Sequence, residues 1–252
     1  MKEYSFVKRI ISICPSCVYQ VNRSLFVFVS SFMERIERKK IFISDTIGHI
    51  SVEILRSQHT RYVMVLAHGA GAGMDHGFMK QLAVALGEYG IDTIRFNFPY
   101  MENNKRRPDV PAVAHKAIQM VVEEAKSLNA NVPLILAGKS FGGRMSSQLM
   151  ATKSIEYVRA LVFYGFPLHP ANKPGVDRAA HLHDVKVPML FLQGTRDALA
   201  HNELIKDVCG SLPNATLIEI EGADHSFKVG KKDSIVDLAK NSFDYLNSLH
   251  FA

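Results

Sequence analysis

Gly138-Lys139-Ser140-Phe141-Gly142-Gly143 is the segment that most clearly indicates how this chain folds. It lies between a branched apolar run at 133–137 and a helix-competent segment at 144–150, and a G-x-S-x-G serine in that setting has the spacing of a nucleophile elbow. The spacing has a physical cause, because so tight a turn strains the backbone of Ser140 and leaves no room for side chains two residues to either side. Gly138 and Gly142 remove those side chains. We therefore take Ser140 as the candidate nucleophile.

Apolar, strand-like runs alternate with helical patterns from residue 41 onward. Strands are expected over 40–45, 50–55, 62–67, 92–97, 133–137, 159–164, 187–192 and 215–219. Helices are expected over 76–89, 110–128, 144–151, 198–212 and 233–249. Strands that alternate with helices predict an α/β fold, a mainly parallel twisted sheet of about eight strands flanked by helices. The longest connection, 165–186, has a short helical piece near 177–183 and leaves room for only a minimal cap.

The distribution of charge argues against a nucleic-acid partner. The formal net charge of the 252 residues is +6, but residues 1–40 hold 8 of the 30 Lys and Arg and only 3 of the 24 Asp and Glu. The other 212 residues carry 22 basic and 21 acidic side chains, so the body of the protein is nearly neutral. The basic patch that nucleic acid requires is therefore not expected.

Residues 1–37 read as an N-terminal extension to a domain at 38–252. The extension has an apolar run at 24–32 that is too short to span a bilayer, so no stable membrane insertion is expected. No A-x-A-like cleavage site follows the run, and charge resumes at once. We favour Met33 as the native start, with residues 1–32 an upstream extension of the reading frame. A genuine targeting or membrane-surface segment and a disordered tail are the alternatives.

The three cysteines form no disulfide framework. Cys14 and Cys17 have C-x-x-C spacing, but no β-α-β pattern surrounds them and no second pair completes a zinc site, so we expect incidental thiols. Cys209 lies in a predicted helix and is expected to be a small core residue. Reduced thiols suit a cytoplasmic enzyme. The alternative is an exported or membrane-surface protein, if residues 1–32 are a targeting segment.

A base and an acid for the serine lie just after two predicted strands. An attacking serine needs a base to take its proton and an acid to orient that base. Asp197 follows the strand at 187–192 and His225 follows the strand at 215–219, which is the chain order serine, acid, histidine. Taken alone, Asp197 is also a candidate N-cap for the helix at 198–212. Asp224 and Asp177 are rival acids, although Asp224 adjoins the base in sequence.

A glycine-rich loop supplies candidate donors for a developing oxyanion. The loop His68–Gly73 follows the predicted strand at 62–67. Its backbone N–H groups, with the N–H of Phe141, are placed to bind a tetrahedral oxyanion. Taken alone, the loop is also compatible with a flexible turn.

Four motifs together resemble those of the α/β-hydrolase superfamily. They are Leu66-Ala67-His68-Gly69-Ala70-Gly71-Ala72, Gly138-Lys139-Ser140-Phe141-Gly142-Gly143-Arg144, Gln193-Gly194-Thr195-Arg196-Asp197 and Gly222-Ala223-Asp224-His225-Ser226-Phe227. More closely, residues 38–250 resemble a branch of small hydrolases akin to dienelactone hydrolases, whose relatives include a subunit of a chromatin acetyltransferase complex. The resemblance implies Ser140, Asp197 and His225 as a catalytic triad, with Ala70 and Phe141 as oxyanion-hole residues.

This resemblance implies a serine hydrolase that cleaves an ester or thioester through an acyl-enzyme intermediate. His225, oriented by Asp197, would deprotonate Ser140 for attack on the carbonyl carbon. The expected partner is a small-molecule acyl substrate, and neither a cofactor nor a metal is needed for this chemistry. The alternatives are a non-catalytic binding or scaffold protein, since fold does not determine function, and a serine peptidase of the same fold.

Several basic residues lie close in sequence to the predicted site. Lys139, Arg144 and His68 are the candidate substrate-binding residues. One hypothesis is an electropositive pocket that prefers a carboxylate or phosphate, to which further cations would contribute: Arg95, Arg196 and the run at 105–107. The alternative is that such charges form a solvated face. His181, His183 and Asp184 have the side chains of metal ligands, but we expect surface residues there and no metal site.

Overall fold

The computed structural model describes residues 35–128 and 131–251. The chain divides into two units, Met1–Ile36 and Glu37–Ala252, and we describe the second. The candidate start at Met33, the pair Cys14 and Cys17, and the apolar run at 24–32 lie outside the described residues. In the part of the chain that is described, no helix is both long and apolar enough to cross a membrane.

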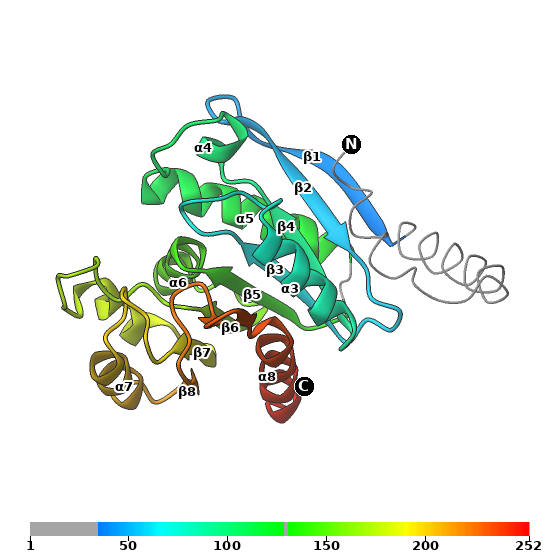
Figure 1. Ribbon diagram of the computed structural model, residues 1–252. Helices are drawn as coiled ribbons and strands as arrows, with labels where there is room; N and C mark the ends of the chain where they lie inside the picture. The colour runs from blue at the N-terminus through cyan, green and yellow to red at the C-terminus, as the bar shows by residue number, and fades with distance from the viewer. Residues whose placement is uncertain (1–34, 129–130, 252) are drawn as a thin grey trace, which may run out of the picture. The chain divides into compact units, whose positions relative to one another are not determined.

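The centre of the larger unit is an eight-stranded sheet in the order β1-β2-β4-β3-β5-β6-β7-β8 (Figure 1). The strands are β1 Ile36–Ser44, β2 Gly48–Leu55, β3 Tyr62–Ala67, β4 Ile91–Phe96, β5 Leu134–Lys139, β6 Val158–Tyr164, β7 Met189–Gly194 and β8 Ala215–Ile220. The pairing of β2 with β4 is antiparallel, whereas β4, β3, β5, β6, β7 and β8 run parallel to one another. The predicted fold class is confirmed, with β5 and its elbow in the middle of the sheet.

Helices cover both faces of this sheet. They are α3 Gly77–Gly87, α4 Pro99–Glu102, α5 Pro111–Leu128, α6 Phe141–Lys153, the 3₁₀ helix η1 Asp177–Asp184, α7 Asn202–Gly210 and α8 Ile235–Ser248. α3 and α8 pack together on one face and α5 and α6 on the other (Figure 1). Each face has its own apolar core, one with Leu82 of α3 and Leu238 of α8, the other with Ile118 of α5 and Met145 of α6. The inner strands are therefore buried on both sides, which is why they read as continuous apolar runs.

Among the differences between the structure and the predicted elements, two concern helices near the site. The helix expected from residue 198 begins only at Asn202, because the carbonyl of Leu199 accepts the N–H of His169 and the N–H of His201 donates to the His169 ring. These tertiary bonds replace the first turn of a helix. The second difference is the short helix α4, whose first residue is Pro99, in a segment for which no helix was predicted.

Candidate active site

The strand-to-helix turn at Ser140 has the strained geometry of an elbow. β5 ends at Lys139 and α6 begins at Phe141, and Ser140 between them has a positive φ of 49° with ψ of −114°. A Cβ at Gly138 would lie 2.3 Å from the backbone nitrogen of Gly143, within the turn itself. A Cβ at Gly142 would lie 2.5 Å from the carbonyl oxygen of Ala67 on the neighbouring strand β3. The two glycines therefore allow the turn to close and to pack against β3.

A chain of hydrogen bonds joins the serine to a histidine and a carboxylate from two other strand ends. The Nε2 atom of His225 lies 2.9 Å from the Oγ atom of Ser140, and its Nδ1 atom lies 2.7 Å from Oδ2 of Asp197. An ionised carboxylate can only accept, so Nδ1 carries the proton and Nε2 is left to accept from the hydroxyl. This is the protonation state in which a histidine can act as a general base toward Ser140.

The Asp197 carboxylate is buried and held by two further donors. Its side chain has no exposed surface, and it accepts the Nε2–H of Gln193 at 2.6 Å and the N–H of Leu199 at 2.7 Å. Gln193 in turn accepts the N–H of Phe166 through Oε1 at 2.9 Å, so the orientation of its amide is determined. Gln193 belongs to the sequence motif that ends at Asp197, but no role was predicted for it. Its position four residues before the acid, at the end of β7, was the available signal.

The alternative readings of the acid do not fit the geometry. Asp197 is not the N-cap of α7, since His201 occupies that position. Asp224 instead accepts the backbone N–H groups of Ser226 and Lys228, while the Nδ1 atom of His225 bonds to Asp197. Asp177 lies at the start of η1, on the connection between β6 and β7.

Lys139 contacts the histidine loop rather than standing free as a cation. Its Nζ donates to the carbonyl oxygen of His225 at 2.6 Å and lies 5.3 Å from the ring centre of Phe227. Burial lowers the pKa of Lys139 to about 8, and the nearby carboxylates of Asp197 and Asp224 oppose this shift. Lys139 therefore stabilises the loop that carries His225, and it also lines the cavity beside Ser140.

The two candidate oxyanion donors both lie near the serine. Phe141 is the first residue of α6, and Ala70 lines the same cavity as Ser140. Among the described residues, the backbone N–H groups of Ala70 and Phe141 donate to no protein acceptor. Both groups are therefore free to bind an oxygen atom of a ligand.

His68 is not placed to bind substrate, contrary to the expectation from sequence. The side chain is fully buried, with Nδ1 2.7 Å from the carbonyl oxygen of Gly69 and Nε2 3.0 Å from the backbone nitrogen of Phe98. Burial lowers its pKa to about 4, so the ring is neutral at physiological pH. Its hydrogen bond to Gly69 supports the glycine-rich loop from the interior of the protein.

A cavity of about 720 Å³ lies beside Ser140 and His225. Its wall is mainly apolar and is formed by Phe78, Met79, Leu199 and Ile235, with the glycine-rich loop on one side. Such a mixture of an apolar wall and a few polar groups is typical of a small-molecule site.

The basic residues expected around the cavity are mostly elsewhere. Within the described residues, Lys139 lines the cavity, whereas Arg144 does not. Lys228 also lines it, although it was not among the predicted site residues. The pKa of Arg144 is lowered by burial and by the neighbouring Arg178. Arg196 and the run at 105–107 are exposed, as expected if these charges form a solvated face. Arg95 is buried in an ion pair with Glu53.

No group of three or more metal-ligating side chains gathers anywhere in the described residues. His183 is exposed, as expected, but His181 is not a free surface residue. Its Nε2 lies 2.8 Å from the Oγ atom of Ser147 on α6, and burial together with Arg144 lowers its pKa to about 4. His181 thus attaches η1 to α6.

Comparison with known proteins shows to which family this chain belongs. The family model described as "Alpha/beta hydrolase domain" matches residues 60–245. A serine hydrolase homologue from Coxiella burnetii is 22% identical, with 82% of this chain and 97% of that chain covered and a TM-score of 0.68. A serine hydrolase without a lid from Xanthomonas campestris is 20% identical, with coverages of 86% and 96% and a TM-score of 0.67. A dienelactone hydrolase from Anabaena variabilis is 16% identical, with coverages of 85% and 98% and a TM-score of 0.64.

These likenesses to solved structures show a shared fold, and the family match spans most of the chain. The match begins before β3 and ends within α8, so it includes the elbow, Asp197, His225 and the glycine-rich loop. This chain therefore belongs to the alpha/beta hydrolase family.

Proposed function

We propose that this protein is a serine hydrolase that cleaves a small ester or thioester through an acyl-enzyme intermediate. The observation that carries the proposal is the unbroken chain from Asp197 through His225 to Ser140, with bonds of 2.7 Å and 2.9 Å. Family membership and the serine hydrolases among the structural neighbours support it.

The reaction has two halves. In the first, Ser140 Oγ attacks the carbonyl carbon while its proton passes to Nε2 of His225, and the oxyanion accepts the N–H groups of Ala70 and Phe141. The bond to the alcohol or thiol then breaks, and His225 returns the proton to that leaving group. In the second half, water attacks the acyl-enzyme with His225 again as base, which releases the acid and restores Ser140.

The shape of the cavity favours a small acyl group. About 720 Å³ bounded by Phe78, Met79, Leu199 and Ile235 can hold a short aliphatic or aromatic acid. The connection between β6 and β7 carries only the 3₁₀ helix η1, which packs on α6, so it supplies no large lid of the kind that shelters a long lipid chain.

The proposal is tested by labelling and turnover in matched variants. The wild-type protein should react with a fluorophosphonate probe at Ser140 and hydrolyse p-nitrophenyl acetate or butyrate, whereas Ser140→Ala should do neither while keeping its melting temperature. Ser146→Ala is the control, because that hydroxyl is buried on the same helix without a hydrogen-bond partner. Labelling or turnover that survives Ser140→Ala would refute the assignment, and a wild-type protein inert to the probe and to esters would favour a non-catalytic protein.

A further inference from the structure

The glycine-rich loop that carries Ala70 is held through its carbonyl oxygens. The carbonyl of Gly69 accepts the Nδ1–H of His68 at 2.7 Å, and the carbonyl of Ala70 accepts the hydroxyl of Tyr100 at 2.9 Å. The same hydroxyl lies 3.2 Å from the Gly69 oxygen. Two consecutive peptide units of the loop are thus held by side chains that do not line the cavity.

Holding these carbonyls determines where the N–H groups point. A trans peptide unit is planar, and its C=O and N–H point in opposite directions. The carbonyl of Gly69 and the N–H of Ala70 belong to one such unit, so a donor on the carbonyl fixes the N–H on the other side. Without the donors this unit is easily rotated, because Gly69, which precedes it, lacks the Cβ that restricts a backbone.

The protonation states of both donors suit this task. The Nε2 atom of His68 accepts the N–H of Phe98 at 3.0 Å, so the proton of the neutral ring must be on Nδ1. The Tyr100 side chain is almost fully buried, and burial raises the pKa of its phenol, so the hydroxyl keeps its proton. Each side chain can therefore donate throughout the working pH range of a histidine base.

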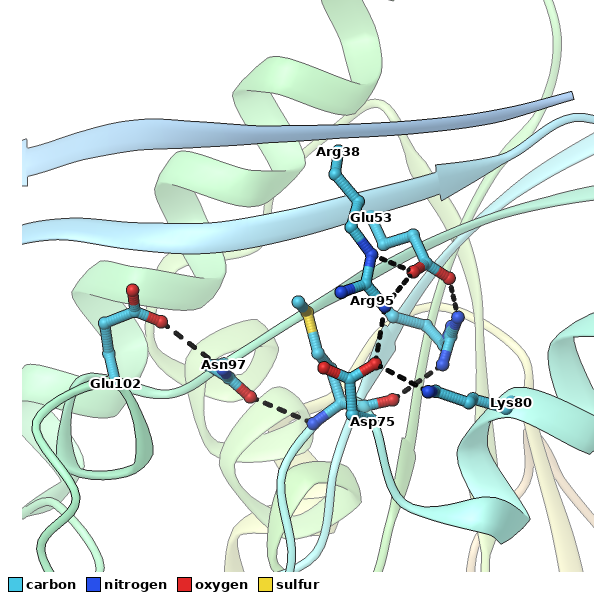
Figure 2. A network of polar contacts seen from close by, with 8 residues as sticks. Arg38, Glu53, Asp75, Lys80, Arg95, Asn97 and Glu102 are labelled. Carbon is cyan, nitrogen blue, oxygen red and sulfur yellow. Dashed lines mark hydrogen bonds and ion pairs between the residues drawn. The ribbon is translucent and has the colours of Figure 1, made fainter. Parts of the chain in front are cut away.

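The far end of the same loop, at Met74, is held by Arg95 and Asn97, which belong to the network of polar contacts drawn in Figure 2. Arg95 donates to the carbonyl of Met74 at 2.6 Å, and the N–H of Met74 donates to Oδ1 of Asn97 at 3.0 Å. Arg95 is itself paired with Glu53, and the Nδ2 atom of Asn97 donates to Glu102 at 3.3 Å.

Apart from His68, the residues that hold the two ends of the loop thus lie within 95–102, the end of β4 and the helix α4. Tyr100 and Glu102 are both on α4, which fixes the distance between the two attachments. The ring of Tyr100 also contacts the ring of Phe141, the other candidate oxyanion donor, at 6.3 Å and 86°. One short segment therefore touches both sides of the oxyanion site.

We propose that Tyr100 is a positioning residue for catalysis: its hydroxyl holds the Gly69 and Ala70 carbonyls so that the Ala70 N–H faces the carbonyl attacked by Ser140. This inference rests on the function proposed above. It predicts that the hydroxyl contributes to the transition state more than to the binding of substrate, because the oxyanion forms only as the serine attacks.

Tyr100→Phe removes this hydroxyl and leaves the ring in its contacts with His68, Phe98 and Phe141. We expect kcat for a p-nitrophenyl ester to fall about tenfold with KM within about twofold, since a misdirected donor loses part of the 10²–10³-fold effect of a missing one. The rate of fluorophosphonate labelling at Ser140 should fall in parallel. The preference for an ester over the matching thionoester should shrink, because sulfur is a weak acceptor and gains little from an intact oxyanion site.

Tyr164→Phe is the matched control. Tyr164 is also buried, and its substitution removes the hydrogen bond between its hydroxyl and Ser242 at the α8 face of the sheet. It should lose a similar amount of thermal stability without a change in kcat or in the ester preference. A Tyr100→Phe protein with the kcat and ester preference of the wild type would overturn the inference while leaving the proposed function intact.

A second variant acts at the other attachment of the loop. Asn97→Ala removes the acceptor of the Met74 N–H and should lower kcat in the same sense, with KM again unchanged. An effect on KM alone, in either variant, would show that the segment shapes the substrate pocket instead and would also overturn the inference. A wild-type protein that neither reacts with the probe nor hydrolyses esters would, by contrast, refute the proposed function itself.

Discussion

Replacing Lys139 by methionine should change how the stability of the protein depends on pH. The ammonium group is withdrawn from water beside His225, and burial lowers its pKa from 10.5 to about 8. Below pH 8 the lysine is charged in both the folded and the unfolded chain. Between pH 8 and pH 10.5 the folded protein has released this proton while the unfolded chain still holds it.

The sign and size of the effect follow from linkage. Stability rises with pH wherever the unfolded chain binds more protons, so the wild-type lysine contributes an increasing free energy of unfolding across this window. With folded and unfolded pKa values of about 8 and 10.5, the increase from pH 7 to pH 9 is about 1.3 kcal/mol. A methionine side chain does not titrate, so the Lys139→Met protein lacks this increase.

The assay is urea unfolding of the wild-type and Lys139→Met proteins at pH 7, 8 and 9. The difference between their free energies of unfolding should move by about 1.3 kcal/mol in favour of the wild type as the pH rises. Lys139→Arg should show the same slope against the wild type, because a guanidinium stays charged throughout. A difference that is flat from pH 7 to pH 9 in both variants would refute the reasoning, and would mean that water reaches Nζ freely.

Two further substitutions test the acid and the elbow. Asp197→Asn places an amide N–H against one of the donors whose hydrogen bonds the carboxylate now accepts, so the His225 ring loses its orientation. Ester turnover should then fall roughly 10³–10⁴-fold. Asp224→Asn is the control, and equal losses of turnover in the two variants would contradict the assignment of Asp197 as the acid. Gly142→Ala puts a Cβ 2.5 Å from the Ala67 carbonyl and should cost about 1–3 kcal/mol in urea unfolding together with most of the activity. Gly210→Ala is the control, because nothing lies within 4 Å of the added Cβ, and it should leave the free energy of unfolding unchanged or slightly raised. If Gly142→Ala also left it unchanged, β3 would have to move to make room for the Cβ.

Local signals in the chain were sufficient for the architecture. The apolar runs at 62–67 and 133–137 became β3 and the start of β5 because strands buried on both faces must be apolar throughout. The spacing of Gly138, Ser140 and Gly142 likewise reflects a turn that only small residues allow, so it is visible without the fold. The helix α4 was missed, since its four residues are too few to show a helical period.

Contacts between distant segments decided the remaining roles. In the sequence alone, Asp197 is also a candidate helix cap. In the structure the Leu199 and His201 backbones bond to His169, so α7 begins later and the Asp197 carboxylate bonds to His225.

His68 and Tyr100 make the same point at the oxyanion loop. His68 looked like a substrate contact because it adjoins the loop in sequence, but the Phe98 N–H from the end of β4 turns it inward. Tyr100 carried no sequence signal, because its partners lie about thirty residues away. By itself, the sequence determined the sheet, the elbow and the strand ends that meet beside it, since these follow from short-range sterics and burial. Which side chains bind, brace or merely pack at those ends was decided by tertiary structure, because a hydrogen bond is directional and its geometry exists only once the strands are side by side.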